Sequence, residues 1–395
     1  MKKNMVVLMM LVLALMIGCG KEGSKEAKKK NLNYSAETRA DGVKVIKNNG
    51  KGSIAELNLG LKEVMTITGE DNSEEGNKDR VFSKVNGLVV DSKGNIFVGD
   101  MGSSSIKKFD KNGKFVKSFG RAGSGPGEYG MLADLCINND TINVFDPMAN
   151  KYVKFNSDGK FIGDKIFTDG SKPMFLADAG SNNLIGLNSV PEMKDGILYF
   201  PVNVQLFDSK FNGSTVIDSR KLEFDLKNPQ INPTDLFTPF GYSQKKIYIG
   251  DVSEDFMKIR VYDLNGKQLE EYSKNYRKSE MTKKQMDSYK SAVQTDGEHQ
   301  NKLTKAYNKA IEEMFIDKRG RVWVKKAKTK KNEDLQEVEF DIFENGVYLN
   351  KLTLKVGLGT NMLINTKSMF YFFNDHLYYI DENDGDIVLK ILEYT

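Results

Sequence analysis

Four aspartates that each follow a short apolar strand are the residues whose type and spacing come nearest to a chemical site. They are Asp100, Asp146, Asp251 and Asp381. Carboxylates that recur in this way either accept hydrogen bonds within their own turns or ring one end of a repeat array, where their oxygens can bind Ca²⁺. We expect the turn-forming role. No cofactor is predicted, and a divalent cation such as Ca²⁺ at these aspartates is the alternative.

Other reactive side chains are few. The chain of 395 residues has two His and two Cys, which excludes a His-rich metal site and a disulfide scaffold. Neither His299 nor His376 has a Ser or Cys motif beside it, so no catalytic residue is predicted. Cys136 lies in an apolar triplet and is expected to be a buried, inert thiol. The glycine-rich stretch 120–127 lacks the Lys-Ser/Thr of a phosphate-binding loop and is expected to join two repeats. An enzyme is therefore not the favoured expectation.

The N-terminus has the features of a targeting segment. Lys2 and Lys3 precede an apolar run from Met5 to Ile17, which is too short to span a membrane as a helix. The run ends in Gly18-Cys19, which resembles the bacterial lipobox. A plain secretory signal with an accidental cysteine is the alternative.

The lipobox resemblance implies that residues 1–18 are removed and that Cys19 carries a diacylglycerol and a palmitate-type acyl chain. Residues 19–41 are then a flexible tether, and the membrane is a partner through the lipid. The protein would be exported and anchored to the cell envelope. Gly20 is not the Asp that retains many lipoproteins at the inner membrane, which favours the outer membrane.

Net charge does not indicate a nucleic-acid partner. The formal charge is +4, and removal of residues 1–18 lowers it to +2 because Lys2 and Lys3 are lost with no acid. No basic face recurs in the rest of the chain, so no nucleic-acid binding is expected.

A strand motif repeats from residue 82 onward. Its first copy, Ile96-Phe97-Val98-Gly99-Asp100, lies within a run of four short strands joined by Asn/Asp-Gly turns. Six copies begin at Ile96, Ile142, Leu184, Ile247, Val322 and Leu377. Their spacings are 46, 42, 63, 75 and 55 residues. Four-stranded repeats at this period predict an all-β, six-bladed β-propeller of antiparallel blades over residues 42–395.

Ring closure requires an additional strand for the last blade, because an open ring leaves an unpaired edge. The segment between Gly42 and Gly69 offers Val43–Ile46 and Ile54–Leu57. We expect one of these two to complete the blade that contains residues 369–394.

The stretch from Gly87 to Glu128, with VDSKGNIFVGD, IKKFDKNGKFVKSFG and GSGPGE, resembles NHL-repeat propellers. The region of about 43–394 is similar to the bacterial six-bladed β-propeller lipoproteins. The resemblance is specific in blades one and two and loose in blades three to six. It implies the fold and a surface-binding role but no reaction.

Residues 279–315 interrupt the strand pattern. Apolar residues at helical spacing predict an inserted pair of amphipathic helices between blades four and five. The proposed binding stripe consists of Met286, Tyr289, Val293, Leu303 and Tyr307. A helical pair on one face of a repeat array often marks the working face, although packing against the propeller explains the same pattern.

These features predict a binding module at the cell envelope with a protein, peptide or glycan partner, bound at the face that carries 279–315. One alternative is a channel-centred, metal-dependent hydrolase or lyase. The other is a structural accessory subunit of an envelope complex, for which an exposed apolar patch would be the signature.

Overall fold

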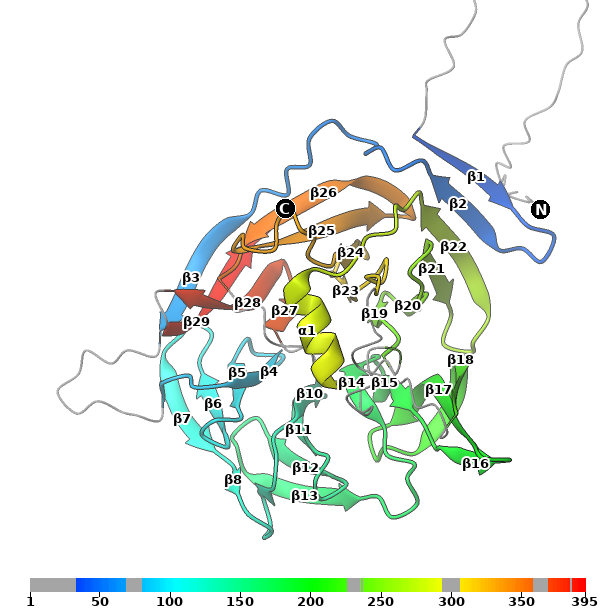
Figure 1. The fold of residues 1–395 in the computed structure, drawn as a ribbon. Coiled ribbons are helices and arrows are strands. Elements are labelled where there is room, and N and C mark those ends of the chain that lie inside the picture. Colours follow the sequence, from blue (N-terminus) through cyan, green and yellow to red (C-terminus); the bar gives the residue numbers. More distant parts are fainter. Residues whose placement is uncertain are drawn as a thin grey trace, which may run out of the picture. The chain divides into compact units, whose positions relative to one another are not determined.

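Six sheets, each built on four antiparallel strands, stand around a central axis and form a β-propeller (Figure 1), and two of the sheets carry additional strands. The computed structural model describes residues 33–68, 80–225, 235, 237–292, 306–357, 369–383 and 386–395. The predicted all-β, six-bladed fold is confirmed. In each blade the first strand lies toward the axis and the last lies at the perimeter.

The first three blades follow each other along the chain. Blade one contains β4 (Val85–Val90), β5 (Ile96–Asp100), β6 (Ser105–Phe109) and β7 (Phe115–Phe119). Blade two contains β10 (Asp134–Asn138), β11 (Thr141–Asp146), β12 (Lys151–Asn156) and β13 (Phe161–Ile166). Blade three contains β14 (Met174–Asp178), β15 (Asn183–Asn188), β17 (Ile197–Asp208) and β18 (Gly213–Asp225), with β16 (Glu192–Lys194) paired to β17.

The last three blades complete the ring. Blade four contains β19 (Phe240–Ser243), β20 (Lys246–Gly250), β21 (Met257–Tyr262) and β22 (Gln268–Lys274). Blade five contains β23 (Glu313–Ile316), β24 (Val322–Lys325), β25 (Glu337–Glu344) and β26 (Val347–Lys355). Blade six contains β27 (Phe370–Phe373), β28 (His376–Asn383), β29 (Asp386–Glu393) and β3 (Lys62–Thr68).

The strand that closes the ring is β3, which pairs antiparallel with β29. Both segments expected for this role are therefore wrong. The first, Val43–Ile46, lies largely in β2 (Lys44–Asn48), which instead pairs in parallel with β22 at the perimeter of blade four. The second, Ile54–Leu57, is not a strand. A further strand, β1 (Tyr34–Thr38), pairs with β2 and forms the outer edge of that blade.

Tight polar turns join the third and fourth strands of the blades. In blade one, Asp110 Oδ1 accepts hydrogen bonds from the backbone N–H of Asn112 and Lys114, at 2.9 Å each. Gly113 follows with φ +79°, a conformation that glycine adopts without strain. Asn156, Asp208 and Asp263 accept the same pair of hydrogen bonds in blades two, three and four.

The glycine-rich stretch 120–127 joins blades one and two, as expected. Its flanks, β8 (Arg121–Ala122) and β9 (Glu128–Tyr129), form a short parallel pair. The carboxylate of Glu128 accepts a hydrogen bond from the Gly125 N–H at 2.8 Å and pairs with Arg121 at 2.6 Å. These contacts give the stretch a structural role.

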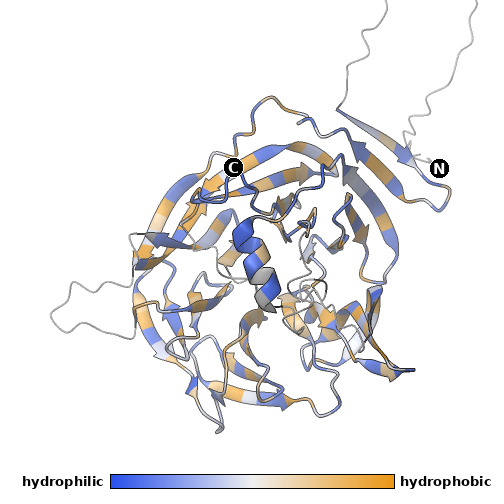
Figure 2. Ribbon diagram, viewed as in Figure 1, coloured by the Kyte–Doolittle hydropathy of each residue, from blue (hydrophilic) through white to orange (hydrophobic). Residues whose placement is uncertain are grey.

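Apolar side chains bury the surfaces between adjacent blades, and hydrophobic and hydrophilic bands alternate along the strands (Figure 2). Trp323 is fully buried, and its indole N–H donates to Asp317 Oδ2 at 3.2 Å. Cys136 is buried, and burial raises the pKa of its thiol. Cys136 is therefore the buried thiol that was expected, and Trp323 is part of the core.

The insertion between blades four and five contains one helix in its described part, α1 (Lys283–Ala292). The prediction of a second helix is wrong for the described residues of that segment. Residues 306–312 are irregular, and Glu313–Ile316 form β23. Ala310, Ile311 and Met314 matched a helical period because all three are buried in the propeller core.

Candidate functional site

The two faces of the ring differ in the connections that they carry. Because successive strands run antiparallel, second-to-third strand loops and blade-to-blade connections emerge on one face, and the remaining turns emerge on the other. The helix α1 belongs to the connection from blade four to blade five and projects over the middle of the ring in Figure 1. We call the face with this connection the α1 face. It carries residues 279–315 and is therefore the face at which the sequence predicted binding.

A capping box starts α1. The N–H of Gln285 donates to Thr282 Oγ1 at 3.2 Å, and the Gln285 side chain accepts a hydrogen bond from the Thr282 N–H at 2.8 Å. This reciprocal pair satisfies two backbone donors that a helix N-terminus otherwise leaves unpaired. Thr282 is buried, whereas Lys283 and Lys284 are exposed on the first turn. The helix is mostly hydrophilic (Figure 2).

A short stem of two antiparallel segments carries α1. The outgoing segment holds Glu280, which forms a β-bridge with Tyr307 of the returning segment. Asn308 is buried between them, and its side-chain amide contacts the hydroxyl of Ser279 and the carbonyls of Glu280 and Lys328. The buried amide therefore fixes the base of α1 to both segments and to blade five.

The first turn of α1 also contacts the long loop between β24 and β25. Lys284 Nζ pairs with Asp334 at 2.8 Å, and the Lys284 N–H donates to Glu333 at 3.2 Å. Both ionic partners are exposed, so this pair contributes little to stability. The contact holds the first turn of α1 next to the β24–β25 loop.

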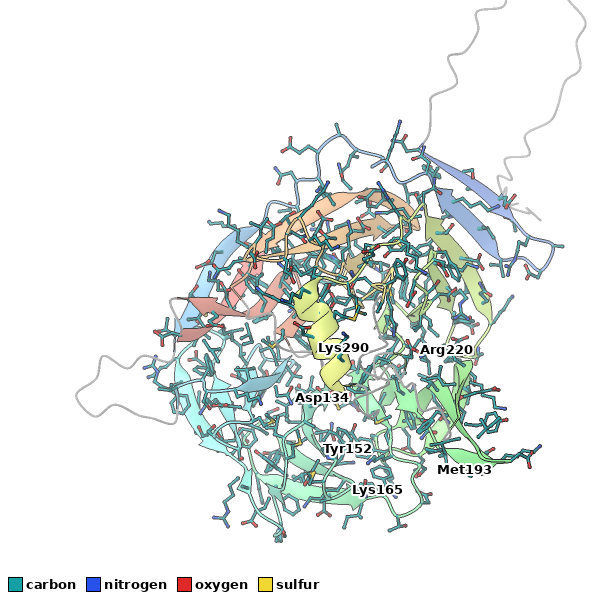
Figure 3. All side chains as sticks on the ribbon, in the orientation of Figure 1. Asp134, Tyr152, Lys165, Met193, Arg220 and Lys290 are labelled. Atoms are coloured by element: carbon teal, nitrogen blue, oxygen red, sulfur yellow. The ribbon has the colours of Figure 1, made fainter. Side chains whose placement is uncertain are left out.

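Buried charge lies beside the stem. Lys309 Nζ is 2.7 Å from Asp235, and the Arg220 guanidinium donates to the Asp235 carbonyl and to Thr238. Burial lowers the pKa of both Lys309 and Arg220, although Asp235 acts in the opposite direction. These contacts link blade three, where Figure 3 labels Arg220, with the connection to blade four and the returning segment of the insertion.

Exposed apolar side chains occur in connections of the α1 face that are distributed around the ring. Those with at least two-fifths of their surface exposed are Val81, Met148, Val190, Met193, Phe256 and Leu335. The other large apolar residues exposed to this degree lie on perimeter strands or near β2, and none lies in the tight turns of the opposite face, within the described residues. The two faces therefore differ in apolar exposure as well as in loop length.

The four recurrent aspartates are separate hydrogen-bond centres in their own blades. Asp100 and Asp146 are fully buried, and each accepts from backbone N–H groups of a blade connection and of its own loop. Asp251 pairs with Arg260 at 2.8 Å, and Asp381 pairs with Lys390 at 2.7 Å. The described residues contain no group of three or more His, Cys, Asp or Glu side chains arranged to hold a metal ion.

The expected binding stripe is only partly visible. Met286 lies on α1 and is half-buried, and Tyr307 lies on the returning segment with the Lys278 ammonium 4.1 Å from its ring centre. The side-chain placement of Tyr289 and the positions of Val293 and Leu303 lie outside the described residues, as does Cys19.

A side cavity that the sequence analysis did not identify lies between blades two and three. Its volume is about 390 Å³, within the size range of small-molecule sites. Lys165 and Asp169 line it from the end of β13 and the following connection, and Asn188, Gln205 and Asn212 line it from blade three. Aromatic rings of Phe167, Phe207 and Phe211 form its apolar part.

Comparison with known proteins supports the architecture. The family model DUF5128, described as a 6-bladed beta-propeller, matches residues 76–213. This segment spans blades one and two and part of blade three, about a third of the chain. No curated protein matches the sequence.

Solved structures that resemble this chain are distant in sequence. A Bacteroides fragilis protein whose name proposes that it is exported is 13% identical, with a TM-score of 0.49, and the match covers 89% of this chain and 99% of that one. A DUF4221 member from Bacteroides vulgatus is 11% identical, with a TM-score of 0.49 and coverage of 85% and 98%. Virginiamycin B lyase from Staphylococcus aureus is 11% identical, with a TM-score of 0.41 and coverage of 84% and 99%. Likenesses at this level say nothing about activity.

Proposed function

We propose that this chain is an exported, lipid-anchored β-propeller that binds a protein, peptide or glycan partner through its α1 face. The anchor would be the lipid on Cys19, and the envelope membrane would be the second partner. The proposal includes that the repeats are of the NHL type and that the protein is located at the outer membrane. None of the helices in the described part of the chain is long and apolar enough to cross a membrane.

The observation that carries the proposal is the difference between the two faces. Exposed apolar side chains next to charged ones are typical of protein interaction surfaces. On the α1 face, Phe256 and Leu335 are each about half exposed, and Lys284 of α1 pairs with Asp334, which precedes Leu335 in the chain. In the tight turns of the opposite face, backbone N–H groups already form hydrogen bonds within each turn.

Site-specific photo-crosslinking in living cells tests this proposal. A crosslinking amino acid is placed at Met193, Phe256 or Leu335 on the α1 face, and at Lys111 or Lys318 in turns of the opposite face as the matched controls. We expect one discrete adduct from the α1-face positions and none from the controls. Equal labelling from both faces, or adducts only from the controls, would contradict the choice of face.

The anchor has a separate test. Replacement of Cys19 by Ser should abolish incorporation of labelled palmitate and move the protein from the membrane fraction to the soluble exported fraction. A Cys136→Ser variant is the matched control and should stay with the membrane, because Cys136 is buried in blade two. Retention of the C19S variant in the membrane would contradict lipid anchoring.

A channel-centred metal enzyme is the alternative to which the recurrent aspartates point. A melting temperature that falls with a chelator and rises with added Ca²⁺ would favour it. A melting temperature that responds to neither would favour the binding module.

A further inference from the structure

Two of the junctions between neighbouring blades share one contact. In each, the glycine of the turn between the third and fourth strands lies beneath an aromatic ring from the fourth strand of the preceding blade. A Cβ added to Gly159 of blade two would lie 2.6 Å from the Phe119 ring of blade one, and one added to Gly346 of blade five would lie 3.0 Å from the Tyr272 ring of blade four. These close contacts leave no room for a side chain on the glycine.

The junction between blades two and three reverses this arrangement. The turn of blade three begins at Asp208, and the N–H of Phe211 closes it onto the Asp208 carbonyl at 2.9 Å. Phe211 therefore takes the place of the turn glycine, with φ +65° against +74° for Gly159. In the register of the preceding strand, Lys165 of β13 takes the place of Phe119 of β7, two residues before a blade connection.

The reversed junction is strained and well packed at once. A bulky residue in the left-handed region costs about 1–3 kcal/mol and persists only where the surroundings impose it. The Phe211 ring stacks on Tyr152 at a centroid distance of 4.5 Å, and the Lys154 ammonium lies 4.3 Å from the ring centre. Such strain is concentrated at functional sites.

The cavity beside this junction is lined by hydrogen-bonding side chains, and its one positive and one negative side chain balance each other. Lys165 supplies one cation and Asp169 one carboxylate (Figure 3 labels Lys165). Asn188 is nine-tenths buried, and its Nδ2 donates to the Ser171 carbonyl at 2.8 Å, while its Oδ1 accepts no hydrogen bond from the described residues. Gln205 and Asn212 add further amide groups from the opposite wall.

We propose that this cavity binds a neutral carbohydrate of one or two sugar units. Sugar hydroxyls both donate and accept hydrogen bonds, and side-chain amides offer both partners. The side chains of Phe167, Phe207 and Phe211 are almost completely buried and form the smaller, apolar part of the lining. A ligand with net charge would find one opposite and one like charge, which does not favour it. The site is separate from the α1-face proposal and does not depend on it.

Calorimetric titration of the full-length protein in detergent tests the site. The probes are glucose, galactose, N-acetylglucosamine, maltose and cellobiose, with glucuronate and glucosamine as charged counterparts. We expect at least one neutral sugar to bind. Lys165→Phe should abolish that binding, because it places there the aromatic ring that Phe119 supplies at the junction of blades one and two and fills the cavity. Lys160→Phe makes the same exchange at an exposed position of blade two outside the cavity and should bind as the wild type does.

A second variant keeps the test valid if Lys165→Phe does not fold. Gln205→Leu removes an amide at nearly constant volume and should weaken binding by about tenfold, the usual consequence of one lost hydrogen bond. The proposal is overturned if no neutral sugar binds, if only the charged sugars bind, or if folded Lys165→Phe binds as the wild type does. Each of these results leaves the crosslinking test of the α1 face unaffected.

Discussion

Phe211 shows how one residue can be strained and stabilising at the same time. Replacement by Gly would relieve the left-handed backbone, a gain of about 1–2 kcal/mol, but would remove a buried ring, a loss of about 3–5 kcal/mol. We therefore expect Phe211→Gly to lower the free energy of unfolding by about 2 kcal/mol in urea titrations. An increase in stability would mean that the stack on Tyr152 contributes little.

Asp100 gives a prediction that depends on pH. Burial alone would raise the pKa of its carboxyl, but the Lys84 N–H and the hydroxyls of Ser83 and Ser103 more than offset this and lower the pKa. A lowered pKa adds stability that is present above the unfolded value near 4 and is lost as the pH falls through the folded value. Lys107 is buried 3.6 Å away and shares the site.

We expect Asp100→Asn to lower the free energy of unfolding by about 3 kcal/mol at pH 7, because it leaves the Lys107 ammonium buried without its carboxylate. The difference from the wild type should shrink below pH 4, where the wild-type carboxyl takes up a proton. Denaturant titrations at pH 7, 5 and 3 measure it. Asp110→Asn, in an exposed turn of the same blade, is the control and should cost little at any pH. A difference that is constant over this range would contradict the role given to the charge.

At the scale of single residues, the sequence repeat contains both the regular positions and one departure from them. The strand motif located Asp100 and Asp146 correctly at the ends of second strands. The lysine at 165 stands where blade one has Phe119, and this departure was present in the aligned repeats. A lysine on an outer strand is ordinary, so this departure alone does not predict a cavity, which depends on the positions of Phe211 and Asn188 in the folded chain.

Among the elements, α1 depends most on local sequence. Thr282→Ala removes one half of the capping box, which costs about 1 kcal/mol. We expect the amide hydrogens at Lys284 and Gln285 to exchange about fivefold faster, with the melting temperature of the ring nearly unchanged. Lys283→Ala, on the exposed side of the same turn, is the control and should exchange as the wild type does. A large drop in the melting temperature would mean that the stem supports the propeller itself.

The elements that were predicted wrongly share one cause. The strand that closes the ring, β3, has a single buried residue, Ile67, and five exposed ones, so its sequence resembles a surface loop. The segment before β23 shows the opposite case. Its apolar residues are buried by the neighbouring blades and match a helical spacing by coincidence. Burial imposed by distant parts of the chain does not follow the period of the local element.

For the molecule as a whole, β3 matters more than β1 and β2. A chain that starts at residue 61 keeps β3 and loses the two outer strands of blade four and the buried Leu59, so we expect it to fold as a monomer with a reduced melting temperature. A chain that starts at residue 84 leaves β29 as an open edge and should aggregate or form dimers. Circular dichroism and size-exclusion chromatography distinguish these outcomes. A monomeric, cooperatively melting second chain would contradict the closure by β3.

The pairing of Thr68 in β3 with Val388 in β29 also determines when the ring can close during synthesis. The strand that closes the ring is synthesised before any complete blade, and its partner is almost the last segment to be made. Contacts so distant in sequence carry a large loop-closure entropy and form slowly. If the chain crosses a membrane from its N-terminus, β3 arrives long before its partner and waits unpaired. A holding chaperone on the far side of the membrane would then act early on this exposed strand, and the rate of maturation would depend on how long it is protected.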